Sequence, residues 1–409
     1  MTYHDPKQVL ENLRNHFASH EKRIVFIFGA GTSCAVNISA PGQPYKPLIP
    51  AVAGLTKICK DAVIKEKAAF ATAWTALEAE LVAEKGDLVK DNIEAILSKI
   101  RMKFDAMSGE DTLLGLKRPD FEEIEKRITK TIAENVQPEE SMIPEKNPHR
   151  NFARWVSRTQ RQSPIEIFTT NYDILIEKAL EQERVPVFDG FVGSHKPFFL
   201  AESLIRSELA PGKNWTRLWK VHGSVNWELQ TESNQKRIVR TKPVKTGEMI
   251  LPSHYKYDES RKQPYVALLQ RLSTVLDNND TLLVTIGYSF NDEHINNIIF
   301  DSAAAHHRTH IVSLQYEELP SENDLIKHAK DRSNLMILGP ETAIIGTRLG
   351  KWKLNEKTEE NISDFMTTAF ECDKLVAGAK GEPPLTGKLK LGDFNCFAEF
   401  LNSIVYGAR

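Results

Sequence analysis

Four short segments combine glycine with polar side chains that could bind a phosphate, hold a sugar hydroxyl or transfer a proton. They are Gly29-Ala-Gly-Thr-Ser33, Thr169-Thr-Asn-Tyr-Asp173, His222-Gly-Ser224 and Gly287-Tyr-Ser-Phe-Asn-Asp292. Glycine lets a ligand approach the backbone, and the first N–H groups of a helix attract a pyrophosphate. A histidine that faces such a ligand can act as a general base. Together these residue types indicate a phosphate-bearing ligand and a proton transfer.

Each segment also has a purely structural interpretation. Gly29 and Gly31 could form a tight turn, because a third glycine at the usual dinucleotide spacing is missing. Thr170 or Asn171 could cap the next helix, although capping does not explain Asn171 and Asp173 together. A single histidine such as His222 is more often structural than catalytic. The fourth segment could be a turn that leads into a capped helix.

The positions of the four segments favour the functional interpretation. Each follows an apolar run typical of a buried strand, and open α/β sheets bind ligands at the carboxyl ends of their strands. We predict these strands at Arg23–Phe28, Ile165–Phe168, Leu218–His222 and Thr281–Ile286, with a fifth at His310–Leu314. Helices are expected at Ile174–Leu180 and His294–Ala305. Alternating strands and helices predict an α/β fold with a Rossmann-like parallel sheet flanked by helices.

Two further regions complete the predicted organisation. Residues 51–161 have a helical pattern and are expected to form a helical insertion, with Asp91 as the N-cap of one helix. Residues 1–317 would then form the catalytic domain. Residues 318–409 would form a small C-terminal extension, with assembly as one interpretation of its role. In it we expect a hairpin of 335–338 with 343–349 and a helix at Asn395–Tyr406.

The composition restricts the class of protein. The 409 residues are 41% hydrophobic and 26% charged, as in ordinary globular proteins, and the net charge is −2. Direct binding to nucleic acid is therefore not expected. The basic residues from Lys236 to Lys245 are interpreted as a solvated hairpin face, because few aromatic residues are interleaved with them.

The N-terminal sequence and the cysteines indicate a cellular location. The first residues lack the features of a signal peptide, and no stretch reaches the roughly 18 apolar residues that a membrane helix needs. We expect a cytoplasmic protein without membrane contact. The cysteines Cys34, Cys59, Cys372 and Cys396 are scattered without a CxxC pair, so we expect neither structural zinc nor disulfides.

In their order and approximate spacing, the four segments resemble the NAD site of sirtuins. The GAG-x-S turn matches Gly29, Ala30, Gly31 and Ser33, and the T-x-N-x-D stretch matches Thr169, Asn171 and Asp173. The H-G pair matches His222 and Gly223, and the late G-x-S matches Gly287 and Ser289. The resemblance covers about residues 20–315. It implies that Asn171 holds the nicotinamide ribose and a water, and that His222 is the base acting on a ribose hydroxyl. Thr170 and Asn291 are added to the expected NAD-binding residues.

The chain departs from protein-deacylating sirtuins in two ways. Their four-cysteine zinc module follows the H-G pair, whereas no cysteine lies between His222 and Gly287, so thiolates for tetrahedral zinc are missing there. The loop after Ser33 keeps only Leu48-Ile-Pro50 of the family's G-I-P-D-F-R run. The stretch Asn92–Leu97 is instead similar to the insertion of bacterial sirtuin-like antiphage effectors, among which the HerA-associated protein is most similar in size.

This resemblance implies an NAD glycohydrolase that uses NAD as a substrate and depletes it during phage defence. It also implies a homo-oligomer that is silent until activated, with a HerA-type ATPase as a possible partner. Two alternatives stay open. One is an NAD-dependent protein deacylase, and the other is a non-catalytic NAD-binding scaffold subunit.

Overall fold

The computed structural model describes residues 2–85, 92–232, 235–242, 263–278, 280–355, 364–373 and 385–406. Within these residues the main sheet has ten strands in the order β1-β16-β15-β14-β13-β12-β2-β5-β9-β6. The strands are β1 (Tyr3–His4), β2 (Arg23–Phe28), β5 (Glu166–Thr169), β6 (Val187–Phe188), β9 (Thr216–Lys220), β12 (Thr281–Ile286), β13 (His310–Leu314), β14 (Leu335–Leu338), β15 (Thr342–Ile345) and β16 (Arg348–Trp352). All pairings from β14 across to β6 are parallel, whereas β15 is antiparallel to both β14 and β16.

The predicted α/β fold with a Rossmann-like parallel sheet is confirmed. Strands β2, β12 and β13 have the bounds expected from the sequence. Strand β9 ends at Lys220, so the prediction that it continues to His222 was wrong. The chain turns there, because Gly223 has a φ of +85° and its N–H donates to the Lys220 carbonyl. His222 therefore lies on a turn just beyond the strand.

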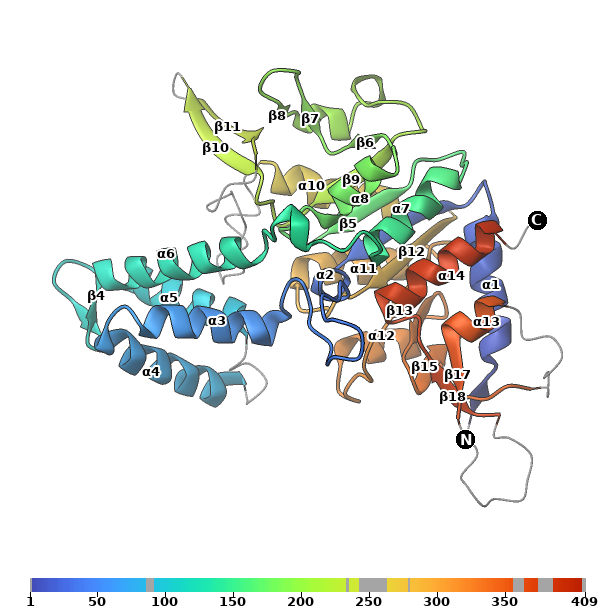
Figure 1. Cartoon of the computed structure of the whole chain (residues 1–409), viewed down its shortest axis with the longest axis horizontal. Coiled ribbons are helices and arrows are strands. Elements are labelled where there is room, and N and C mark those ends of the chain that lie inside the picture. The colour runs from blue at the N-terminus through green and yellow to red at the C-terminus, as the bar shows by residue number, and fades with distance from the viewer. Residues whose placement is uncertain are drawn as a thin grey trace, which may run out of the picture.

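Helices cover both faces of the sheet, as the alternation along β2 requires (Figure 1). Phe26 and Phe28 point to one face and Val25 and Ile27 to the other, and all four are buried. The first face is covered by α1 (Pro6–Ala18), α7 (Pro148–Arg158), α8 (Leu175–Gln182), α13 (Asp364–Ala369) and α14 (Phe394–Tyr406). The second is covered by α10 (Tyr265–Leu276), α11 (Glu293–Ala305) and α12 (Asp324–Asp331).

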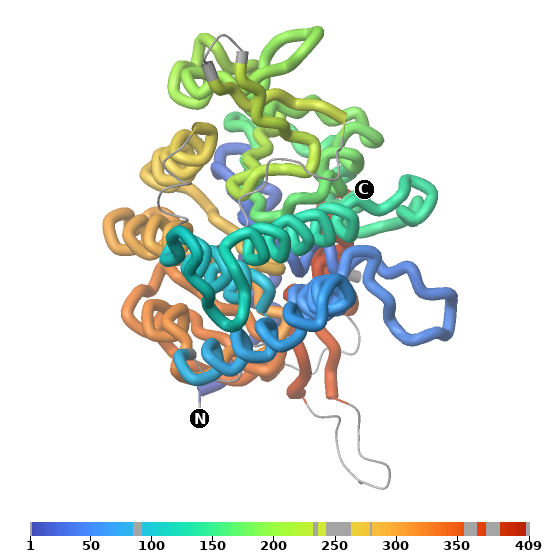
Figure 2. The backbone as a smooth tube through the Cα atoms, turned by 90° about the vertical axis from the view of Figure 1, so that its left-hand side faces the viewer, coloured from blue at the N-terminus to red at the C-terminus, as the bar shows by residue number. Residues whose placement is uncertain are grey.

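The predicted helical insertion forms a lobe beside the sheet (Figures 1 and 2). Its helices are α3 (Val52–Ile64), α4 (Ala68–Lys85), α5 (Ile93–Ala106) and α6 (Arg118–Asn135), with a short hairpin of β3 (Thr112–Leu113) and β4 (Leu116–Lys117). The lobe packs around one apolar cluster, which also includes Leu175 and Val225 from the segments after β5 and β9. Helix α7 was included in the predicted insertion but packs in the cluster of the sheet.

The N-cap expected at Asp91 was also assigned to the wrong residue, and Asp91 itself lies outside the described residues. Asn92 caps α5, because its side chain accepts hydrogen bonds from the N–H groups of Glu94 and Ala95.

The segment after residue 317 extends the same sheet. Strands β14 and β15 form the expected hairpin, with Ile337 opposite Ile344. The second predicted strand, 343–349, is split into β15 and β16 because Gly346 and Thr347 both have positive φ and form a turn. Helix α14 packs against α7, and a small hairpin of β17 (Phe370–Cys372) and β18 (Gly387–Leu389) precedes it. The division of the chain at residue 317 stays a prediction.

A second, four-stranded sheet is formed by segments on both sides of His222 in the chain. Its order is β10-β11-β8-β7, from β10 (Trp227–Glu232), β11 (Gln235–Arg240), β8 (Phe198–Phe199) and β7 (Phe191–Val192). Aromatic packing stabilises it, with the Phe191 ring 5.1 Å from Trp227 and 5.6 Å from Phe199. The basic residues through Lys242 lie on or beside the β10–β11 hairpin, where Arg240 pairs with Asp189 at 2.6 Å, while Lys245 lies outside the described residues.

Neither a membrane-spanning helix nor a cluster of metal ligands is found among the described residues. None of the helices in these ranges is both long and apolar enough to cross a membrane. In the same part of the chain, no three His, Cys, Asp or Glu side chains converge as metal ligands. All four cysteines are free thiols.

Candidate functional site

The four glycine-containing segments meet at one edge of the parallel sheet. From β2 the sheet continues through β5 and β9 on one side, and through β12 and β13 on the other. The direction of strand order therefore reverses between β2 and β12. In open α/β sheets this switch point, at the carboxyl ends of the strands, is the usual ligand site. It is where residues 29–33 and 287–292 follow β2 and β12.

The glycines pack the first and last segments against each other. The Gly31 N–H donates to the Gly287 carbonyl at 3.0 Å. A Cβ on Gly29 would lie 2.3 Å from the Gly287 oxygen, and a Cβ on Gly31 would lie 2.6 Å from the Gly287 Cα. These contacts explain why both positions are glycine. The space that a side chain would take on this side is filled by the Gly287 loop.

Asn171 is anchored to the first segment through its amide nitrogen. This Nδ2 donates to the Gly29 carbonyl at 3.0 Å, to Thr32 Oγ1 at 3.0 Å and to Ser33 Oγ at 2.8 Å. Thr32 Oγ1 in turn donates to the Gly29 carbonyl at 2.9 Å. Three acceptors thus share the two N–H bonds of a partly exposed side chain. The amide orientation leaves Oδ1 as its remaining acceptor.

Asp173 extends this network to the start of α8. Its Oδ2 accepts the Ser33 hydroxyl at 2.6 Å, and its Oδ1 accepts the Leu175 N–H at 2.9 Å. The Asp173 carbonyl accepts a hydrogen bond from the buried Lys220 ammonium, which also donates to Glu177 at 2.9 Å. Burial raises the pKa of the Glu177 carboxyl, and the charge of Lys220 opposes that rise. Ser33 and Asp173 are therefore buried supports of the loops, 2% and 5% exposed.

His222 is paired with a carboxylate from the last segment. Its Nε2 lies 2.8 Å from Asp292 Oδ2, and the two residues are only 8% and 7% exposed. The ring is also 6.4 Å from that of Tyr172 at an interplanar angle of 34°. His222 and Asn171 each lie two residues beyond neighbouring strands, since Thr169 pairs with Lys220. The structure therefore brings both predicted catalytic residues to adjacent positions on this edge.

The other predicted binding residues lie at the surface of the same edge. Ala30, Gly31, Ser289 and Asn291 are exposed, and Thr170 is partly exposed, with its N–H bonded to the Phe28 carbonyl. The positions with free access are thus distinct from the buried pair Ser33 and Asp173. A ligand above these loops would contact the exposed set.

Sequence reasoning missed two residues of this constellation. Asp292 ended the fourth segment but was not among the predicted catalytic or NAD-binding residues. Lys220 is a cation at the end of an otherwise buried strand, Thr216–Lys220, and such a residue needs a buried partner. That pattern was visible in the sequence, whereas the partners of both residues depend on tertiary structure.

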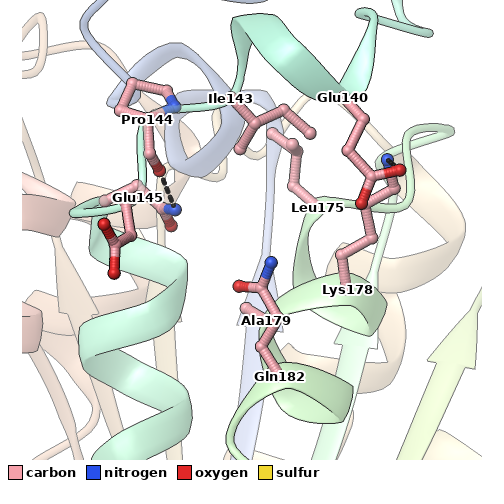
Figure 3. A pocket seen from close by; sticks show the side chains of 9 residues that line it. Glu140, Ile143, Pro144, Glu145, Leu175, Lys178, Ala179 and Gln182 are labelled. Atoms are coloured by element: carbon pink, nitrogen blue, oxygen red, sulfur yellow. Dashed lines mark hydrogen bonds and ion pairs between the residues drawn. The ribbon is translucent and has the colours of Figure 1, made fainter.

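A small hollow lies beside these loops, between α8 and the connection to α7 (Figure 3). It encloses about 50 Å³ and is lined by apolar Ile143, Pro144, Leu175 and Ala179 with polar Glu140, Glu145, Asn147, Lys178 and Gln182. Lys178 lies 3.8 Å from Glu140 across it. The volume suits one or two waters rather than a dinucleotide, so the hollow is separate from the candidate site.

Comparison with known families bears on the same elements. Residues 165–337 match the family described as SIR2-like domain, a range that includes Asn171, His222 and the 287–292 segment but begins after Gly29–Ser33. No curated protein matches the chain. SIR2-like domains use NAD and are usually enzymes. Residues 165–337 of this chain are therefore similar to a domain that uses NAD.

Proposed function

We propose that this protein is an NAD glycohydrolase, which cleaves NAD to nicotinamide and ADP-ribose. The observation that carries the proposal is the anchored Asn171 amide beside the buried His222, both at the carboxyl edge of the sheet and both within the residues that match a SIR2-like domain. Hydrolysis requires a positioned water and a proton acceptor. The two side chains provide one of each.

Asn171 is suited to hold the attacking water. Its amide nitrogen is committed to Gly29, Thr32 and Ser33, so the Oδ1 can accept a hydrogen bond from water or a ribose hydroxyl. Three fixed contacts lower the entropy lost when the water is positioned. In this proposal Asn171 acts without changing its own protonation.

In the reaction, the bond between the nicotinamide nitrogen and the ribose carbon breaks, and the bond's electron pair leaves with neutral nicotinamide. Positive charge develops on the ribose in an oxocarbenium-like transition state, as in glycoside cleavage. The water oxygen then bonds to that carbon and releases one proton. His222 accepts a proton from the water or from a ribose hydroxyl, a role typically worth about 10²–10⁴-fold in rate.

The exposed residues of the same edge would bind the rest of NAD. Ala30 and Gly31 expose their backbone to solvent at the start of α2 (Ala30–Cys34), which follows β2. Thr170 follows β5, and Ser289 and Asn291 follow β12. Because β5 and β12 are the neighbours of β2 in the sheet, these polar side chains lie on the same edge as α2. Ser33 and Asp173 would hold the loops in register through their mutual hydrogen bond. Zinc has no part in this proposal.

We also propose a biological role, which rests on the resemblance to bacterial sirtuin-like antiphage effectors. An enzyme that destroys an abundant metabolite must be silent until it is needed, and we propose an NAD-depleting effector of bacterial antiphage defence. Control would come from homo-oligomer assembly or from a HerA-type ATPase partner. Contact with DNA would then belong to the partner.

The first prediction tests the site. The purified chain, alone and with a HerA-type ATPase, should release nicotinamide and ADP-ribose from NAD in equal amounts, as measured by chromatography. Asn171→Ala and His222→Ala should each lower the rate by about 10²-fold or more, because each removes one function of the step. Glu145→Ala, an exposed change in the α7 connection, serves as the control. NAD that stays intact in every mixture while still binding would refute hydrolysis.

Protein deacylation is a second candidate, which one observation favours. The four-stranded sheet, whose strand β10 begins at Trp227 just after His222, is a small second unit next to the edge of the main sheet, where a deacylase needs one wall of its peptide groove. Aromatic packing stabilises it in place of metal thiolates. Formation of O-acetyl-ADP-ribose from NAD and an acetyl-lysine peptide would establish this activity. Binding of NAD without either product would indicate the scaffold.

A further inference from the structure

The carboxylate of Asp292 contacts two structural elements at once. Its Oδ2 lies 2.8 Å from His222 Nε2, whereas its Oδ1 accepts the N–H groups of His294 at 3.0 Å and Ile295 at 3.3 Å. The second set of bonds caps α11. Each oxygen therefore has a separate role, and the helix end fixes the position of the oxygen that faces the histidine.

The backbone around Asp292 is also held in place. The Tyr288 hydroxyl lies 3.4 Å from the Asp292 carbonyl and donates to Asn296 Oδ1 at 2.9 Å. Asn296 Nδ2 donates a hydrogen bond to the Phe290 carbonyl at 2.7 Å. The 288–292 loop is thus bonded to the first turn of α11. Asp292 cannot move away from His222 without breaking these contacts.

A fixed anionic acceptor determines which ring nitrogen carries the proton. Neutral imidazole has one N–H donor and one acceptor nitrogen, and a carboxylate hydrogen-bonds only to the protonated nitrogen. With Asp292 at Nε2, the proton of neutral His222 lies on Nε2. The lone pair is then on Nδ1, the nitrogen that could accept a proton.

We propose that Asp292 is a positioning residue for His222, holding the imidazole in the Nε2–H tautomer so that Nδ1 is the base. This inference rests on the proposed hydrolysis for its kinetic consequence, but the tautomer itself does not depend on activity. The alternative is that Asp292 only caps α11. The two roles can be separated, because asparagine and serine cap helices about as well as aspartate but carry no charge.

The test compares Asp292→Asn and Asp292→Ser with the wild-type chain. Asp5→Asn is the matched control, because Asp5 caps α1 through the Lys7 N–H at 3.0 Å, far along the sheet from the site. We expect both Asp292 variants to keep the melting temperature within a few degrees and the KM for NAD within about threefold. Their kcat should fall about 10²-fold or more, as expected when a general base is misoriented.

Nitrogen NMR of protein labelled in its histidine rings gives a readout that capping alone would not change. Wild-type and Asp5→Asn protein should show His222 as the Nε2–H tautomer, identified by the loss of its signals in His222→Gln. In Asp292→Asn the Nδ1–H tautomer should appear, since the amide can donate to Nε2. An Asp292→Asn protein with wild-type kcat and an unchanged His222 tautomer would overturn the proposal.

The two proposals fail in different ways. If the wild-type chain and its complex release no nicotinamide, hydrolysis is refuted, and the tautomer in wild-type and Asp292→Asn protein still decides the role of Asp292. If NAD is cleaved but Asp292→Asn is as active as wild type, hydrolysis stands and the positioning role does not.

Discussion

At the scale of single residues, the glycines of this site allow two backbone segments to pack directly against each other. Gly287 has a φ of +62°, and a Cβ on it would lie 2.6 Å from the Thr32 nitrogen. Gly346 has a similar φ of +54° in the β15–β16 turn, but its Cβ would meet nothing within 4 Å. Alanine substitutions at these two glycines therefore separate the free-energy cost of a left-handed backbone conformation from the cost of a steric clash.

This comparison gives a stability prediction. Gly346→Ala should lower the free energy of unfolding by about 1–2 kcal/mol, the cost of the left-handed region for alanine. Gly287→Ala should cost about 1–3 kcal/mol more, because the added methyl must push the Thr32 loop aside. Urea denaturation measures both. Equal losses would mean that the loops separate without cost.

At the scale of elements, α7 and α14 enclose a histidine in an apolar contact. His149, near the start of α7, is 2% exposed, and its ring lies 5.1 Å from that of Phe394 in α14. Burial lowers the pKa of His149 to about 4, and the charge of Asp173 opposes this only in part. In the described structure His149 Nδ1 has no hydrogen-bond partner. The neutral ring is therefore the form that the fold stabilises.

The pH dependence of stability follows from this shift. An unfolded histidine has a pKa near 6.5, so between about pH 6.5 and 4 the unfolded chain binds a proton that the native chain does not. The contribution of His149 to the free energy of unfolding is fully present above pH 6.5 and decreases by about 3 kcal/mol as the pH falls to 4. His149→Phe should remove that part of the loss. Thermal melts at pH 4.5 and 7 test it, and an unchanged difference between the two pH values would contradict it.

At the scale of the whole molecule, the helical lobe and the site loops share one apolar cluster. Leu175 and Val225 follow β5 and β9 but pack with lobe residues such as Val63 of α3. The Val225 N–H also donates to the Tyr172 carbonyl at 3.0 Å, between Asn171 and Asp173. A change in the lobe can thus reach the candidate site through packing.

A pair of valine truncations tests this coupling. Val225→Ala and Val63→Ala both remove fully buried methyl groups, and each should cost about 2–3 kcal/mol of stability. Both changes should also weaken NAD binding, measured by calorimetry, and only Val225→Ala should also speed amide exchange in residues 169–175. A Val63→Ala protein that binds NAD as tightly as wild type would argue against coupling through the shared cluster.

Much of the fold could be predicted because buried parallel strands leave a strong local signal. Strands β2, β12 and β13 are continuous apolar runs, and their bounds were correct. The second sheet was not predicted, because β7 and β8 are only two residues long, and β8 joins β11 through Phe198 and Val239, which lie 41 residues apart in the chain. Short strands become stable through such pairing rather than through their own pattern.

The residues of the site could be predicted from the sequence, but the hydrogen bonds between them could not. The positions of Asn171 and His222 followed from polar residues at strand ends. The Ser33–Asp173 and His222–Asp292 pairs join residues 140 and 70 positions apart, so no local pattern reveals them. The predicted NAD-binding roles of Thr170, Ser289 and Asn291 stay predictions.

The central position of β2 has a consequence for biosynthesis. Strand β2 is synthesised early, yet one of its two neighbours, β12, is synthesised some 250 residues later. The contact of Gly29 with Gly287 and the hydrogen bond of His222 with Asp292 can therefore form only after that. On the ribosome, a nascent chain shorter than about 290 residues has neither contact. Truncated translation products therefore lack the assembled edge, which the full chain completes only late in its synthesis.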